Sequence, residues 1–138
     1  MIKTILVGYD DTDVSQRALE RAAELVSALE ARLIVTSVAP VATSAAARSI
    51  GADPVETAAD HRAELAEAHR YLEGRGLTAE YIEAVGHEAE SILEAAREQA
   101  ADMIVLGARE VSWVQRLLGQ SVPDAVAHGA RCDVLIVH

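Results

Sequence analysis

The chain has 138 residues, 51% of them apolar, which suits the core of one compact domain spanning 1–138. Its formal net charge of −10 argues against nucleic acid or an anionic membrane as a partner, because both require a basic face. No apolar stretch approaches the ~18 residues of a membrane span. A single cysteine, Cys132, and a predicted strand that starts at Ile2, leaving no room for a signal peptide, favour a cytoplasmic location.

The N-terminal part alternates between strand-like and helix-like segments. Residues 2–8 are short, apolar and β-branched and end in a turn, which predicts a strand. Residues 14–29 carry apolar side chains at helical spacing, and Asp13 with Gln16 three residues later predicts a capping box at the start of that helix. A second strand is predicted over 33–38.

A long irregular connection is predicted over 39–53, where Ala, Ser, Thr, Gly and Pro follow no period. A helix is then predicted over 54–73, because Asp53 suits the N-cap and Pro54 suits the first helical position. Gly74 is expected to end this helix.

The C-terminal half continues the alternation. In chain order we predict a strand over 79–85, a helix over 88–100, a strand over 103–106, a helix over 121–128 and a strand over 134–137. Such alternation is typical of a parallel sheet with helices on both faces. The continuously apolar strands agree, because parallel strands are buried on both sides. The sequence therefore predicts an α/β fold with one doubly wound domain.

Candidate binding residues cluster at the predicted carboxyl ends of the strands, where open parallel sheets bind ligands. These ends carry residues 8–13, Val38 and residues 107–110. The helix that starts at Ser121 should bring its N-terminus beside them, and unpaired helical N–H groups suit phosphate. Arg109 is a nearby cation in a chain with few. A capped helix and a solvated loop would explain the same residues, so both interpretations remain open.

Three segments resemble the universal stress protein family. They are Val-Gly-Tyr-Asp at 7–10, Ala-Asp-Met-Ile-Val-Leu-Gly at 101–107, and the C-terminal part from Ser-Val-Pro at 121–123 to Asp-Val-Leu-Ile-Val-His at 133–138. The resemblance covers the whole chain in the family's order. It implies a Rossmann-like, five-stranded parallel sheet of order 3-2-1-4-5 and a homodimer.

The last strand is the candidate dimer contact. It carries no charge or proline, and in the implied strand order it lies at a sheet edge. Bare apolar edges invite pairing, and a twofold partner offering the same strand would close this one. The residues concerned are Val134, Leu135, Ile136 and Val137.

The resemblance also implies an adenine-nucleotide pocket. Asp10 and the backbone near Val38 would hold the base. The other nucleotide-binding residues that the resemblance implies are Gly8, Tyr9, Thr12, Gly107, Arg109, Ser121 and Val122.

The phosphate loop departs from the family's pattern. Nucleotide-binding members carry a glycine, two residues, a second glycine, nine residues, and a third glycine followed by Ser or Thr. An ungapped alignment places Gly107, Glu110 and Gln120 at the three glycines and Ser121 at the hydroxyl. Gly119 could serve as the third glycine only if the loop were one residue shorter. A carboxylate at position 110 beside a triphosphate is a like-charge contact that costs roughly 1–4 kcal/mol, whereas Gln120 can donate a hydrogen bond.

The sequence therefore predicts a stress-response module with ATP binding weakened or absent, whose pocket takes ATP, AMP, cyclic AMP or no nucleotide. Two alternatives stay open: a nucleotide-gated switch with weak ATPase activity, and a nucleotide-free dimer that binds an unknown protein. No motif pairs a nucleophile with a base, so at most a weak ATPase is expected. No metal site is expected either, because Gln16 and Ala22 replace the glycine and glutamate of a calcium loop beginning at Asp11.

Overall fold

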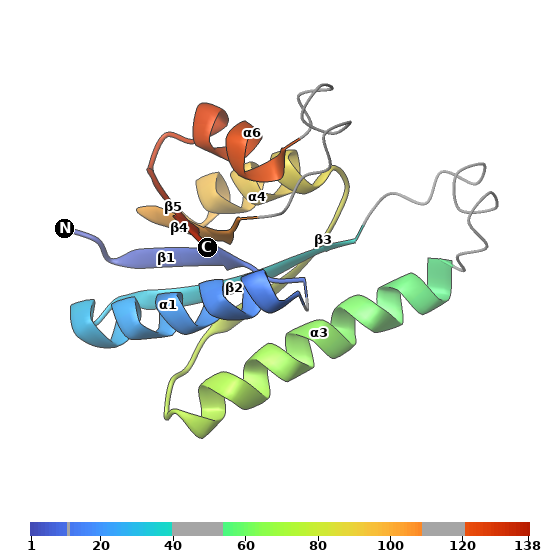
Figure 1. The fold of residues 1–138 in the computed structure, drawn as a ribbon, viewed down its shortest axis with the longest axis horizontal. Helices are drawn as coiled ribbons and strands as arrows, with labels where there is room; N and C mark the ends of the chain where they lie inside the picture. Colours follow the sequence, from blue (N-terminus) through green and yellow to red (C-terminus); the bar gives the residue numbers. More distant parts are fainter. Residues whose placement is uncertain (11, 40–53, 109–120) are drawn as a thin grey trace.

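The computed structural model describes residues 1–10, 12–39, 54–108 and 121–138, with only the backbone at 54–58. Figure 1 shows the strands and helices alternating along the chain. The elements are β1 (Thr4–Gly8), α1 (Asp13–Leu29), β2 (Arg32–Ala39), α3 (Pro54–Gly74), β3 (Glu80–Val85), α4 (Glu88–Glu98), β4 (Met103–Gly107), α6 (Val122–Gly129) and β5 (Asp133–Val137).

All the paired strands are parallel, and the five form one sheet of order β3-β2-β1-β4-β5. This confirms both the predicted α/β class and the predicted strand order. β1 is central, with Val7 opposite Val35 of β2 on one side and opposite Val105 of β4 on the other. Within the described ranges, no helix is long and apolar enough to cross a membrane.

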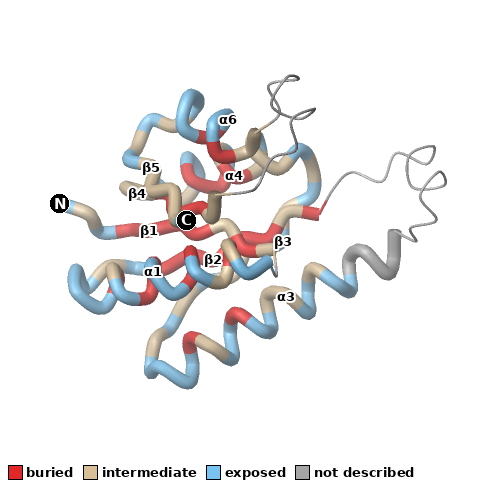
Figure 2. Tube along the Cα trace, viewed as in Figure 1, coloured by how far each residue is buried: buried red, intermediate tan, exposed pale blue. Residues whose placement is uncertain are grey.

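Two helical layers cover the sheet. Helices α1 and α3 lie on one face, and α4 and α6 lie on the other (Figure 1). Successive strand residues point to opposite faces, so Ile5 and Val7 pack in the cluster beneath α1 while Leu6 packs in the cluster beneath α4. All three are fully buried, and Figure 2 shows this burial along the central strands. Each continuously apolar strand therefore contributes side chains to two hydrophobic cores, one on each face of the sheet.

The capping box predicted at the start of α1, with Asp13 as the N-cap, is wrong. Thr12 is the N-cap: its backbone is extended, and its Oγ1 accepts a hydrogen bond from the Ser15 amide at 3.2 Å. Asp13 is instead the first helical residue, where the helix dipole favours an acid. Gln16 accepts a hydrogen bond from the Tyr9 hydroxyl at 3.1 Å, so its side chain ties the helix to the end of β1.

The other predicted helix boundaries lie close to the observed ones. α3 ends at Gly74, and Gly76 two residues later adopts a φ of +71°, which glycine accommodates without strain. Ser121 caps α6, because its Oγ accepts from the Asp124 amide at 3.4 Å. The predicted N-cap Asp53 and the connection over 40–53 lie outside the described residues.

Strand β5 lies at the edge of the sheet and pairs there with β4, as predicted. Its apolar residues Val134–Val137 are half-buried. The dimer contact expected at this strand stays a prediction.

Asp102 fastens the start of β4 to the start of β1. Its Oδ2 accepts hydrogen bonds from the backbone N–H groups of Lys3 and Thr4, both at 2.9 Å. The donation from Lys3, followed by that from Thr4, lowers the pKa of the Asp102 carboxyl. Because the folded-state pKa is the lower one, the stabilisation is present above the unfolded value of about 3.9 and is lost as the pH falls through the folded pKa.

We expect Asp102→Asn to destabilise the protein more at pH 7 than at about pH 3, because only the ionised carboxylate strengthens these two hydrogen bonds. Urea unfolding of the variant and the unsubstituted protein at both pH values measures the difference. An equal difference in the free energy of unfolding at the two pH values would contradict this role.

Candidate functional site

The candidate site lies where the strand order reverses, between β1 and β4. The chain leaves β1 toward β2 on one side and leaves β4 toward β5 on the other, so the crossovers diverge at the carboxyl ends of these two strands. Open α/β sheets bind ligands in the crevice formed at such a point. The ends themselves are the glycines Gly8 and Gly107.

Both glycines lie where a side chain would meet close neighbours, and the contact is with backbone only at Gly107. A Cβ on Gly107 would lie 2.7 Å from the backbone carbon and oxygen of Val14, in the first turn of α1. A Cβ on Gly8 would lie 2.7 Å from the Leu106 side chain. The missing side chains let β4 approach the helix that leaves β1, and this close approach shapes the floor of the crevice.

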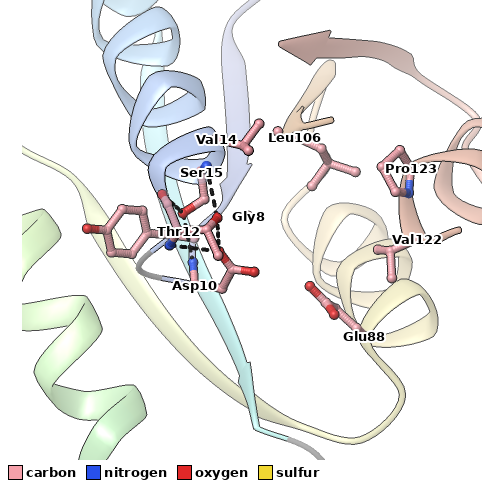
Figure 3. A pocket seen from close by; sticks show the side chains of 11 residues that line it. Gly8, Asp10, Thr12, Val14, Ser15, Glu88, Leu106, Val122 and Pro123 are labelled. Carbon is pink, nitrogen blue, oxygen red and sulfur yellow. Dashed lines mark hydrogen bonds between the residues drawn. The ribbon is translucent and has the colours of Figure 1, made fainter. Parts of the chain in front are cut away.

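A hydrogen-bonded loop orients Asp10 at the end of β1. The Thr12 hydroxyl donates to Asp10 Oδ1 at 2.6 Å, and the Thr12 amide donates to the same oxygen at 3.2 Å. The Asp10 amide in turn donates to Ser15 Oγ at 3.1 Å. Figure 3 shows these bonds at the mouth of the crevice. The carboxylate is therefore held in place before any ligand arrives.

Two adjoining hollows make up the site. A narrow crevice of about 30 Å³ is lined by Gly8, Tyr9, Asp10, Thr12, Val14, Ser15, Glu88, Leu106, Gly107, Val122 and Pro123. A wider cavity of about 450 Å³ is lined by Gly8, Tyr9, Asp10, Thr36, Val38, His61, Glu64, Gly86, His87, Glu88 and Ile92. Four residues border both hollows, so the two lie side by side.

Most of the pocket residues predicted from the sequence come together here. Those that line one hollow or both are Gly8, Tyr9, Asp10, Thr12, Val38, Gly107 and Val122. Ser121 adjoins them as the N-cap of α6, whose first residues Val122 and Pro123 face the crevice (Figure 3). Arg109, Glu110, Gly119 and Gln120 lie outside the described residues.

Several residues that line the cavity were not predicted from the sequence as site residues, among them Glu88, His61 and Glu64. Glu88 begins α4 and reaches into the same opening as Asp10 (Figure 3). His61 and Glu64 lie on α3 and line the wider cavity. An acid in the first turn of the helix that follows β3 is a signal that could have pointed to Glu88, because that turn starts near the carboxyl edge of the sheet.

The described lining is acidic. Asp10, Glu64 and Glu88 contribute carboxylates, and no arginine or lysine lines either hollow within the described residues. A carboxylate attracts hydrogen-bond donors and repels a highly charged anion. This part of the site can therefore accept hydrogen bonds from a ligand.

The whole chain, residues 1–138, matches the model of the Universal stress protein family. The protein named Universal stress protein Rv1636, of Mycobacterium tuberculosis (strain ATCC 25618 / H37Rv), is 37% identical over 142 residues, which cover 99% of this chain and 96% of that protein. Universal stress protein YxiE of Bacillus subtilis (strain 168) is 31% identical over 147 residues and 99% of each chain. A solved universal stress protein in complex with cAMP superposes with a TM-score of 0.80 at 30% identity, covering 99% of this chain and 97% of that one.

Proposed function

The chain belongs to the universal stress protein family, and on that premise we propose that it is a stress-response module that binds an adenine nucleotide of low charge. The observation that carries this proposal is the cavity of about 450 Å³ at the carboxyl ends of β1 and β2, which adjoins the crevice at the switch point and is lined by Asp10 and Val38. Small-molecule sites commonly have volumes of roughly 300–1,000 Å³. The base would lie against these two residues, and the phosphate would lie toward the N-terminus of α6.

The proposed preference is for AMP or cyclic AMP over ATP. Asp10 and Glu88 border the crevice beneath α6, where they would repel successive phosphates of a triphosphate. Glu110, at a glycine position of the family's phosphate loop, would add a third carboxylate. The relative at 30% identity that was solved with cAMP is consistent with a ligand carrying one phosphate.

We further propose that the chain is a homodimer joined through β5. The support is the apolar stretch Val134–Val137 on an edge strand, because an unpaired edge offers backbone donors and acceptors to a second copy. Sedimentation at several concentrations measures the association, and a monomer at every concentration would contradict it.

The nucleotide proposal predicts selective stabilisation by ligand. We expect about 1 mM AMP or cyclic AMP to raise the melting temperature more than ATP does, with and without Mg²⁺. A ligand at 100 times its Kd stabilises the folded state by about 2.7 kcal/mol. Asp10→Asn should reduce the shift, because a neutral amide accepts a hydrogen bond from the base less strongly than a carboxylate does. The variant keeps an acceptor for the Thr12 hydroxyl.

The matched control is Asp60→Asn, which replaces an exposed acid on α3 that lines neither hollow. This variant should keep the full ligand-induced shift. A larger shift with ATP than with AMP would contradict the low-charge preference. No shift with any nucleotide would favour the nucleotide-free dimer instead.

A further inference from the structure

A polar cluster from β2 and α3 closes one wall of the wider cavity. Ser37 Oγ lies 2.8 Å from His61 Nδ1 and 2.9 Å from Glu64 Oε2, and those two atoms lie 2.9 Å apart. Ser37 is fully buried, while the His61 and Glu64 side chains are 14% and 16% exposed. His61 and Glu64 are three residues apart on a helix, which places them on one face.

The hydrogen bonds fix which nitrogen of His61 carries its hydrogen. An ionised carboxylate only accepts, and the single hydroxyl hydrogen of Ser37 is donated to Glu64. His61 Nδ1 therefore donates to this pair, and when the ring is neutral its one hydrogen is on Nδ1. Nε2 is left as an acceptor, and no other described residue makes a hydrogen bond to it.

The wall consequently offers acceptors to whatever occupies the cavity. His61 Nε2 accepts, and so does the carboxylate of Glu64, which lines the same cavity. A ligand amino group would satisfy such a wall. A carbonyl oxygen in the same place is also an acceptor, so neither it nor His61 Nε2 would have a hydrogen-bond donor, and the two would repel each other.

We propose that His61 is a specificity-determining residue that accepts a hydrogen bond from the amino group of the bound nucleobase. Glu64 and Ser37 act as positioning residues, because they hold the ring and fix its hydrogen on Nδ1. The site thereby selects a base with an exocyclic amine over one with a carbonyl at that position. This inference rests on the proposed function, since it requires a nucleotide in the cavity.

The test compares cyclic AMP with cyclic IMP, in which a carbonyl replaces the amine, by calorimetric titration. We expect the unsubstituted protein to bind cyclic AMP about tenfold more tightly or better. His61→Asn removes Nε2 while its amide can still donate to Glu64 from the position of Nδ1. We expect this variant to bring the affinity ratio close to one, mainly by weakening cyclic AMP binding.

The matched control is His69→Asn on the same helix. His69 also pairs with a glutamate, with 3.5 Å between its Nε2 and Glu73 Oε2, but it is 58% exposed and lines neither hollow of the site. This control should keep the ratio of the unsubstituted protein. His61→Gln is a second variant in case His61→Asn folds poorly, as judged by circular dichroism. Its amide can both donate and accept, so it too should bring the ratio close to one.

The outcomes distinguish a failure of this inference from a failure of the proposed function. If the unsubstituted protein binds no nucleotide, the proposed function fails and the inference fails with it. If it binds cyclic AMP and the position-61 variants keep the original ratio, only the inference is overturned. Cyclic AMP has a second hydrogen-bond donor, the 2′-hydroxyl of the sugar. Titration with 2′-deoxy cyclic AMP tests whether His61 contacts that hydroxyl. A variant that alters the deoxy ratio and leaves the amine ratio unchanged would show that His61 contacts the sugar, which also overturns the proposal.

Discussion

Gly107→Ala is expected to destabilise the folded protein by about 1–3 kcal/mol, which is typical of an overpacked interior. The added methyl group would lie 2.7 Å from the backbone of Val14, and a backbone cannot rotate away as a side chain can. The start of α1 would have to move. That turn carries the N-cap Thr12 and the hydroxyl of Ser15, which together hold Asp10, so ligand binding should weaken as well.

Two other glycines provide graded controls for urea unfolding. Gly8→Ala should cost less, because its clash is with the end of the Leu106 side chain, which can adopt another rotamer. Gly74→Ala meets no atom within 4 Å at the end of α3. It should be neutral or stabilising by up to about 1 kcal/mol, because alanine has less freedom to lose on folding. A Gly107 variant as stable as the Gly74 variant would contradict the packing role.

The fold could be predicted because each strand carries its own signal. Ile5, Leu6 and Val7 are consecutive apolar residues, and all three are fully buried because helices cover both faces of a parallel sheet. Local capping was harder to predict. Thr12 and Asp13 are both good N-cap residues, and the one observed, Thr12, also donates its hydroxyl hydrogen to Asp10.

The site could be predicted only where sequence position determines spatial position. Carboxyl ends of parallel strands meet at one edge, which is why Gly8, Asp10, Val38 and Gly107 could be grouped in advance. The wall from α3 could not be grouped in this way. Ser37 is 24 residues from His61 and 27 from Glu64. The sequence between them does not predict the angle at which α3 crosses the sheet. Their contact is a result of tertiary packing.

Replacing both Glu110 and Gln120 with glycine is expected to raise the affinity for ATP by about tenfold or more. The double variant would give the chain the three-glycine pattern that the resemblance implies for nucleotide-binding members of the family, with Gly107 as the first glycine and Ser121 as the hydroxyl residue. Removing a carboxylate beside a triphosphate relieves roughly 1–4 kcal/mol of repulsion, and each 1.4 kcal/mol corresponds to a tenfold change in affinity. Calorimetric titration of ATP and AMP measures both affinities.

The single variant Glu110→Gln separates charge from backbone freedom. If repulsion is the main obstacle, Glu110→Gln should recover most of the gain for ATP with little change for AMP, which carries fewer phosphate charges. If close backbone approach is the obstacle, only glycine should help, because a glutamine side chain still occupies the space. Unchanged ATP affinity in the double variant would contradict both explanations. The proposed preference would then have to come from the described part of the site, where Asp10 and Glu88 border the crevice.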